Sequence, residues 1–356
     1  MESPHGETLS AFAQEPHRPV IIGACPRSGT TLLRTMLNSH PELAIPRETR
    51  FVIEAWQRRK QFGDLRRPAN RRHLARWIFK RRRSLARRLG LDPREAIERL
   101  VAAPPTLGSL LATCFVLYAE KHGKPRWGDK RPKYAAQIAA VWDLYPAAQF
   151  VNVVRDPRAC AASMRKLGWY DRRLAPAVEL WQRAIETVDG WRPKLASDQL
   201  LEVRFEDLVA APETALQRVA TFVGLAADED AVARMLRYHE QKEARSERYH
   251  ANVARPPDPT RVSSWSEALE PAEIAFVEEA TRPLMERYGY EPVANGVAAP
   301  GELLRELRDR RKRQIAARRK LAWNDRIQKL VTHRRPLAAR LPTVASHAAG
   351  GSPSVD

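Results

Sequence analysis

The residues most suited to chemistry lie at 20–33, in the stretch VIIGACPRSGTTLL. A short apolar run leads into a loop that contains Gly23 and Gly29, and Thr30 and Thr31 then open a segment with apolar residues at helical spacing. A strand, a glycine-containing loop and a helix N-terminus together bind phosphate, because the loop amides and the positive end of the helix dipole point at one anion. The stretch therefore predicts a site for a phosphorylated ligand.

The loop differs from the nucleoside-triphosphate loop G-x-x-x-x-G-K-[ST] in two ways. The span from Gly23 to Gly29 is one residue too long, and Thr30 stands where the phosphate-binding Lys would be. The cation is instead Arg27, inside the loop. A ligand with a single 5′-phosphate carries less charge than a triphosphate, so we expect no metal ion. Two weaker alternatives stay open: a nucleoside-kinase-like P-loop enzyme, and a helix cap made by Thr30 or Thr31.

The six residues PRSGTT resemble the 5′-phosphosulfate loop of sulfotransferases that use 3′-phosphoadenosine 5′-phosphosulfate (PAPS) as donor. Other stretches are similar to motifs of the same family, in the family's order, so the resemblance covers roughly residues 19–293. It implies an enzyme that moves a sulfuryl group to an acceptor hydroxyl without a metal ion. It also implies that the 5′-phosphosulfate is held by Arg27, Ser28, Gly29, Thr30 and Thr31, with Arg27 also catalytic.

The stretch FVNVVRDPRACAASM, at 150–164, is similar to the family's binding site for the 3′-phosphate of the donor. Arg155 and Ser163 are eight residues apart, as are the Arg and Ser that contact this phosphate in the family. Guanidinium pairs bidentately with phosphate oxygens, and a hydroxyl adds a further hydrogen bond. The alternative is an Arg paired with Asp156 at the strand end and an unrelated surface Ser.

The stretch PTRVSSWSEALEPAE, at 259–273, resembles the family's late loop, which folds over the same 3′-phosphate. The resemblance assigns Arg261 to the phosphate and Trp265 to packing of the loop. Ser263 and Ser264 stand where family members often have Gly-Arg.

The stretch WGDKRPKYA, at 127–135, is similar to W-G-[DE]-K-[TR]-P in bacterial sulfotransferases and to N-K-D-P in tyrosylprotein sulfotransferases. The resemblance makes Lys130 the residue that contacts the transferring sulfuryl group. A Lys near the bridging oxygen neutralises charge that grows on the leaving phosphate, which stabilises the transition state. The alternative is a solvated cation at a helix start, paired with Asp129.

The stretch NSHPELAIPRETRFV, at 38–52, resembles the segment of tyrosylprotein sulfotransferases that carries a Glu-Glu-Thr-Arg run. The match makes Glu48 the catalytic base, because the acceptor's proton must leave as its oxygen attacks sulfur. Arg50 is assigned to substrate binding, beside Glu48 or the donor. Two alternatives stay open: Glu48 caps a helix that starts near Thr49, or His40 is the base.

Strands that alternate with helices predict an α/β fold, a P-loop-like three-layer arrangement with a central parallel sheet flanked by helices. We expect strands at 20–25, 43–46, 149–154 and 200–204, and a strand or turn at 126–128. We expect helices at 30–39, from 49, 108–121, 133–141, after 157, 173–190, 212–223, 271–287 and 301–335. The expected divisions are a disordered leader at 1–18, a sulfotransferase domain at 19–293 with a basic helical insertion at 58–103, a basic C-terminal helical extension at 294–340 and a disordered tail at 341–356.

The composition is that of a globular protein. The chain has 356 residues, of which 44% are hydrophobic, enough to bury a large core. No apolar run is long enough to span a membrane, and the N-terminus lacks the basic start and apolar block of a secretory signal. The 3 cysteines are far apart and fit neither a metal site nor a disulfide scaffold. We expect a cytoplasmic protein.

The net charge of +19 is concentrated in two segments. Residues 58–88 carry 14 Lys and Arg against one acidic residue, and residues 301–340 carry 14 against four, so the rest of the chain is slightly acidic. We expect mostly solvated helix faces, with docking to an acidic protein or an anionic membrane as the alternative. A nucleic-acid binder driven by these segments would show steep salt dependence, but neither segment interleaves aromatic residues at stacking intervals.

The predicted function is transfer of a sulfuryl group from PAPS to an acceptor hydroxyl. The Glu-Thr-Arg match favours a tyrosine in a peptide or protein, while a carbohydrate, lipid or small metabolite stays open as acceptor. The expected partners are the donor, the hydroxyl acceptor, and an acidic protein or anionic membrane at the basic segments. A homodimer stays open, and nucleic acid is not expected.

Overall fold

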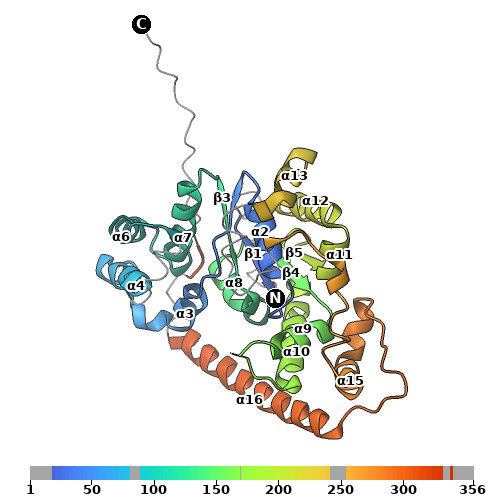
Figure 1. Cartoon of the computed structure of the whole chain (residues 1–356). Coiled ribbons are helices and arrows are strands. Elements are labelled where there is room, and N and C mark those ends of the chain that lie inside the picture. The colour runs from blue at the N-terminus through green and yellow to red at the C-terminus, as the bar shows by residue number, and fades with distance from the viewer. Residues whose placement is uncertain (1–17, 81–88, 169, 241–253, 332–336, 340–356) are drawn as a thin grey trace.

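The fold is organised around a five-stranded parallel sheet with the strand order β2-β3-β1-β4-β5 (Figure 1). This computed structural model describes residues 18–80, 89–168, 170–240, 254–331 and 337–339. The strands are β1 (Val20–Ala24), β2 (Leu43–Ala44), β3 (Arg126–Lys130), β4 (Gln149–Val154) and β5 (Leu200–Arg204). Every pairing is parallel, so the carboxyl ends of β1, β3 and β4 lie at one edge, where α/β folds bind their ligands.

Helices cover both faces of the sheet and bury two apolar layers against it. Successive residues of β1 alternate between the layers: Val20 and Ile22 pack in one and Ile21 in the other. The first layer includes apolar residues of α2 (Thr30–Asn38), α11 (Phe205–Ala210), α12 (Pro212–Val223) and α13 (Glu229–Leu236). The second includes those of α7 (Leu107–Lys121), α8 (Ile138–Leu144), α9 (Pro157–Arg165) and α10 (Leu174–Trp191). The predicted three-layer α/β arrangement is confirmed.

A group of helices lies beside the β2–β3 end of the sheet (Figure 1). It contains α3 (Phe51–Gln57), α4 (Pro68–Lys80), α6 (Pro93–Ala102) and α7. Asp92 caps α6 by accepting hydrogen bonds from the Arg94 and Glu95 amides, both at 2.9 Å. The predicted basic insertion at 58–103 falls largely on α4 and α6, and its residues 81–88 lie outside the described part of the chain.

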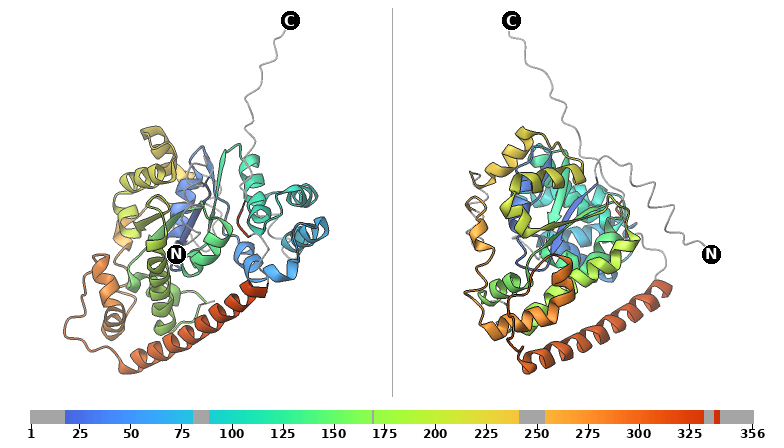
Figure 2. Two further views of the ribbon diagram at one scale, coloured as in Figure 1. Left: turned by 180° about the vertical axis from the view of Figure 1, so that it is seen from behind. Right: turned by 90° about the vertical axis from the view of Figure 1, so that its right-hand side faces the viewer.

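Two long helices follow the sheet in the sequence, α15 (Pro271–Arg287) and α16 (Gly301–Val331). Figure 2 shows α16 as one extended helix along a side of the molecule. Its first half packs on α10, where Leu307 is buried and Arg311 pairs with Glu186 at 2.6 Å. Beyond α16, the Gly108 amide donates to the Leu337 carbonyl at 2.8 Å, so this segment contacts the start of α7.

Some predictions of the chain's organisation lie beyond the described residues. The leader at 1–18 is described only at Arg18, and the tail at 341–356 falls entirely outside. Within the described part, no helix is long and apolar enough to cross a membrane.

Candidate active site

The loop between β1 and α2 has the backbone that an anion site requires. Arg27 and Gly29 both have left-handed conformations, with φ of 72° and 87°, which is strained for a residue with a side chain. A Cβ atom on Gly29 would lie 2.2 Å from Cδ2 of Phe205, so only glycine fits there. Gly29 is the N-cap of α2 and has no side chain with which to cap the amides of its first turn. The amides of the first turn of α2 are therefore oriented toward the loop, as for anion binding.

Three residues that the sequence assigns to the donor lie together beside this loop. The Arg27 Nε donates to Ser163 Oγ at 3.0 Å, and Arg155 Nη1 donates to the Arg27 carbonyl at 2.9 Å. Arg155 also lies over the ring of Phe205, 4.4 Å from its centroid. Burial lowers the pKa of Arg27, and the neighbouring Arg155 cation lowers it further. Two guanidinium groups held this close favour an anion between them.

A buried ionic network fixes the start of the helix that carries Ser163. Asp156 caps α9 by accepting from the Arg158 amide at 2.8 Å. The Arg158 guanidinium pairs with Asp156 at 2.7 Å and with Glu278 of α15 at 2.5 Å. It also lies over the buried ring of Trp265, 4.0 Å from the centroid. Trp265 therefore packs the late loop against α9, as the sequence suggests.

Arg261 ends the short 3₁₀ turn Pro259–Arg261, which contacts α11. Its side chain lies outside what the structure describes. The assignment of Arg261 to the 3′-phosphate stays a prediction.

A second cluster joins the proposed base to the donor loop. The Lys130 Nζ lies 3.4 Å from Glu48 Oε2 and donates to Thr31 Oγ1 at 3.2 Å. The Lys130 side chain is buried, whereas that of Glu48 is 36% exposed. Lys130 is the last residue of β3 and is buried, so the alternative of a solvated cation at a helix start is wrong, and the strand carries the ammonium to the site. These three groups can neutralise an anion and accept a proton within one small region.

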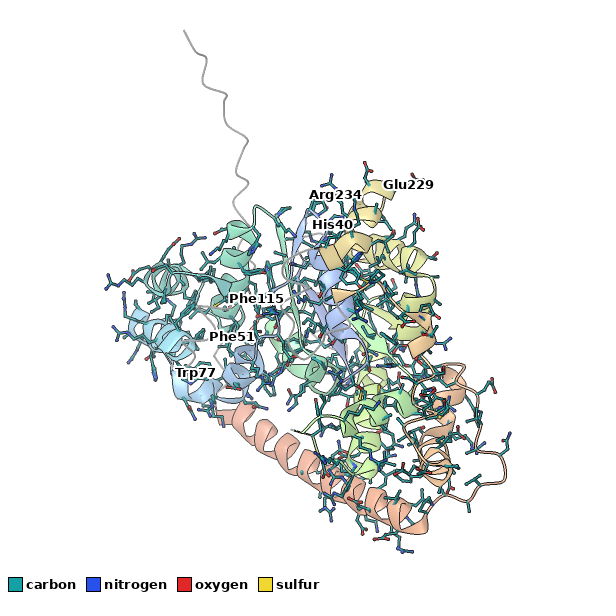
Figure 3. All side chains as sticks on the ribbon, viewed as in Figure 1. His40, Phe51, Trp77, Phe115, Glu229 and Arg234 are labelled. Carbon is teal, nitrogen blue, oxygen red and sulfur yellow. The ribbon has the colours of Figure 1, made fainter. Side chains whose placement is uncertain are left out.

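The two alternatives for Glu48 find no support in the geometry. The helix after it, α3, begins at Phe51, and its N-cap is Arg50 and not Glu48. His40 is buried: its Nδ1 accepts from the Glu42 amide at 3.1 Å, and its Nε2 donates to the Ala226 carbonyl at 2.9 Å. Burial lowers the pKa of His40. Figure 3 places His40 beside α13, where it serves packing.

Arg50 belongs to a group of cations around Glu48. Its carbonyl accepts from Arg131 Nη1 at 3.3 Å, and its side chain is exposed. Burial lowers the pKa of Lys133, and the charges of Arg131, Arg183 and Arg50 lower it further, whereas Glu48 raises it. An acceptor that approaches Glu48 would therefore enter a positive field.

Aromatic rings support the segment that carries Glu48. Phe51 stacks on Phe115 with centroids 5.5 Å apart (Figure 3), and Phe115 stacks on Trp127 of β3 at 5.1 Å. The rings join α3 to the strand that carries Lys130. Neither this support nor the role of Phe205 beneath the loop was part of the sequence prediction, because both depend on contacts between distant residues.

A ligand bound along this edge would have its phosphates among cations and its reacting end beside a carboxylate and an ammonium. This arrangement is typical of enzymes that transfer a group from a phosphorylated donor. A family model described as "Sulfotransferase family" matches residues 19–230, which is more than half of the chain. The chain therefore belongs to the sulfotransferase family, which argues against the nucleoside-kinase alternative.

Relatives and solved structures agree with this membership. A protein-tyrosine sulfotransferase of Drosophila melanogaster is 26% identical over 291 residues, which cover 78% of this chain and 52% of the relative. Protein-tyrosine sulfotransferase 1 of Danio rerio is 27% identical, covering 82% of this chain and 78% of the relative. The chain thus spans about half the length of the Drosophila protein. The sulfotransferase domain of the Synechococcus PCC 7002 olefin synthase shares the fold, with a TM-score of 0.56 and 22% identity, covering 78% of this chain and 98% of that domain.

Proposed function

We propose that this protein transfers a sulfuryl group from PAPS to the hydroxyl of a tyrosine in a peptide or protein. The proposal rests on one observation: two clusters of polar side chains meet at the loop between β1 and α2. In the first cluster, Arg27 contacts Ser163 and Arg155. In the second, Thr31 contacts Lys130, which lies beside Glu48. The names of the relatives, protein-tyrosine sulfotransferases of several animals, support tyrosine as acceptor.

The first cluster binds the donor. Arg27, Ser28, Gly29, Thr30 and Thr31 hold the 5′-phosphosulfate through loop amides, hydroxyls and one guanidinium. Arg155, Ser163 and Arg261 hold the 3′-phosphate, which is absent from AMP, ADP and ATP. No metal ion is needed in this proposal, because guanidinium and ammonium groups supply the positive charge.

The second cluster performs the transfer. The acceptor oxygen forms a bond to sulfur while the bond from sulfur to the 5′-phosphate oxygen breaks. Glu48 takes the proton from the acceptor hydroxyl. The Lys130 ammonium neutralises the charge that develops on the departing phosphate oxygen. In this proposal Arg50, the N-cap of α3 and two residues after Glu48, binds the acceptor.

Nucleotide binding tests the donor assignment directly. The product analogue 3′-phosphoadenosine 5′-phosphate (PAP) should stabilise the protein far more than AMP, because Arg155 and Ser163 bind only the former's 3′-phosphate. PAP at ~100 times its dissociation constant adds about 2.7 kcal/mol to the free energy of unfolding. Equal thermal shifts with PAP and AMP would contradict the assignment, and a preference for ATP that depends on Mg²⁺ would restore the kinase alternative.

Transfer of labelled sulfur to a tyrosine peptide tests the acceptor. The matched control is the same peptide with phenylalanine in place of tyrosine, which lacks only the hydroxyl. Label on the tyrosine peptide alone supports the proposal. Label on a sugar or lipid alcohol, with none on the peptide, would assign a different acceptor to the same donor site.

A further inference from the structure

Asp129 is a buried carboxylate in the strand that carries Lys130, and it was not among the predicted site residues. Its two oxygens accept from the Thr49 hydroxyl at 3.1 and 3.0 Å. It also accepts from the Lys130 amide at 2.9 Å and from the hydroxyl of Tyr134. One carboxylate therefore joins β3, the segment before α3 and the turn after β3.

The partners of Asp129 are the chain neighbours of the two proposed catalytic groups. Thr49 directly follows Glu48 and is itself buried. Residues 46–50 form neither helix nor strand, so regular secondary structure does not fix the position of Glu48. The Thr49–Asp129 contact ties this segment to the end of β3, from which the Lys130 side chain reaches Glu48 at 3.4 Å.

Keeping an ionised carboxylate at this position is costly to the fold. Burial raises the pKa of Asp129 to about 6, although hydrogen bonds from Tyr134 and Thr49 and the charge of Arg131 act in the opposite direction. At neutral pH the group is charged although it is buried, and burying a charge is less favourable than burying a neutral side chain. A destabilising group that joins two catalytic segments is best explained by what it positions.

We propose that Asp129 is a positioning residue that fixes Glu48 relative to Lys130 by holding Thr49. The inference rests on the proposed function, in which Glu48 is the base. The Thr49 hydroxyl is the link, so its removal should misplace Glu48 and leave the Arg27–Ser163–Arg155 cluster unchanged. A displacement of about 1 Å in an active site can reduce turnover about 10²-fold.

The test is Thr49→Val, which keeps the shape of the side chain and removes the hydroxyl. We expect kcat for sulfuryl transfer to fall between ~10-fold and ~100-fold, while the dissociation constant for PAP changes less than about twofold. Thr49→Ser restores the hydroxyl and should recover most of the turnover. The matched control is Thr281→Val in α15, which is also fully buried and whose hydroxyl donates to the Val277 carbonyl at 2.7 Å. It should keep wild-type kcat even if the protein is less stable.

Glu48→Gln, measured in parallel, distinguishes failure of the positioning role of Asp129 from failure of the assignment of Glu48 as base. If Glu48→Gln loses turnover and Thr49→Val keeps it, the positioning role of Asp129 is wrong and the base assignment stands. If both variants keep turnover, Glu48 is not the base, and the positioning proposal falls with it. If Thr49→Val does not fold, Thr49→Ala decides in the same way, because it also lacks the hydroxyl and introduces no bulk.

Discussion

Replacing Asp129 by Asn should change how the stability of the protein depends on pH. The Asp129 carboxyl is fully buried, and burial raises its pKa from 3.8 to about 6. The folded protein therefore keeps this proton up to about pH 6, whereas the unfolded chain releases it near pH 4. Since the folded state binds more protons between these values, the contribution of Asp129 to stability falls as the pH rises through this window.

The size of the effect follows from the difference between the pKa values of Asp129 in the folded and unfolded states. A shift of about two pKa units corresponds to about 3 kcal/mol, since each unit is worth 1.36 kcal/mol. That is a large share of the ~5–15 kcal/mol by which a domain is stable. Asparagine does not ionise, so the variant lacks this dependence. The hydrogen bonds that the amide makes or loses add an offset that does not change with pH.

The measurement is urea unfolding of both proteins between pH 4 and pH 7.5 at constant ionic strength. The difference between their free energies of unfolding cancels the titration of other groups. Between pH 4 and pH 7.5 it should shift by about 2.4 kcal/mol in favour of the variant, slightly less than the full value because the unfolded carboxyl is already partly ionised at pH 4. Charged and titratable groups that interact with Asp129 include Tyr134, Tyr145 and Arg131. Burial raises the pKa of both tyrosines, so neither titrates in this range. A difference that is flat, or that moves in favour of the wild type, would refute the reasoning.

Three further variants test other parts of the site. Glu48→Gln should reduce turnover ~10²–10⁴-fold with little change in PAP affinity by calorimetry; near-normal turnover would exclude Glu48 as base. Gly29→Ala should abolish PAP binding in a thermal-shift assay, since its Cβ would lie 2.2 Å from Phe205, whereas Gly123→Ala, with φ of 64° and nothing within 4 Å, should retain it. Arg158→Leu should lower the free energy of unfolding by ~3–5 kcal/mol in urea titrations, because it leaves buried carboxylates uncompensated; a loss below ~1 kcal/mol would mean that the network contributes little.

The core of the fold was predictable because its strands are short apolar runs, bounded by residues that interrupt regular secondary structure. β4 and β5 have the bounds 149–154 and 200–204 that the sequence predicts. The helices α12 and α15 also begin and end as expected, each with Pro at its first turn. The six-residue α11 and the eight-residue α13 were missed, since so few residues show little periodicity.

The local motifs of the site were also predictable, but the contacts between them were not. Arg27 and Ser163 are 136 residues apart, and their hydrogen bond exists only because β1 and β4 are neighbours in the sheet. The contact between Thr49 and Asp129 spans 80 residues. A Thr after a candidate base and an Asp before a candidate Lys are common, so their spacing alone gave no signal. Only the parallel order of strands brings them together.

Each half of the site is held by a buried acid at the carboxyl edge of the sheet. Asp156, after β4, holds Arg158 and with it the helix that carries Ser163. Asp129, in β3, holds Thr49 beside Glu48. Buried ionised groups destabilise a fold unless they are well paired, and apolar residues of similar size would often be at least as stable. Their position at the two clusters, one proposed to bind the donor's 3′-phosphate and one proposed to perform the transfer, therefore indicates that the geometry of the site, and not stability alone, determines these two residues.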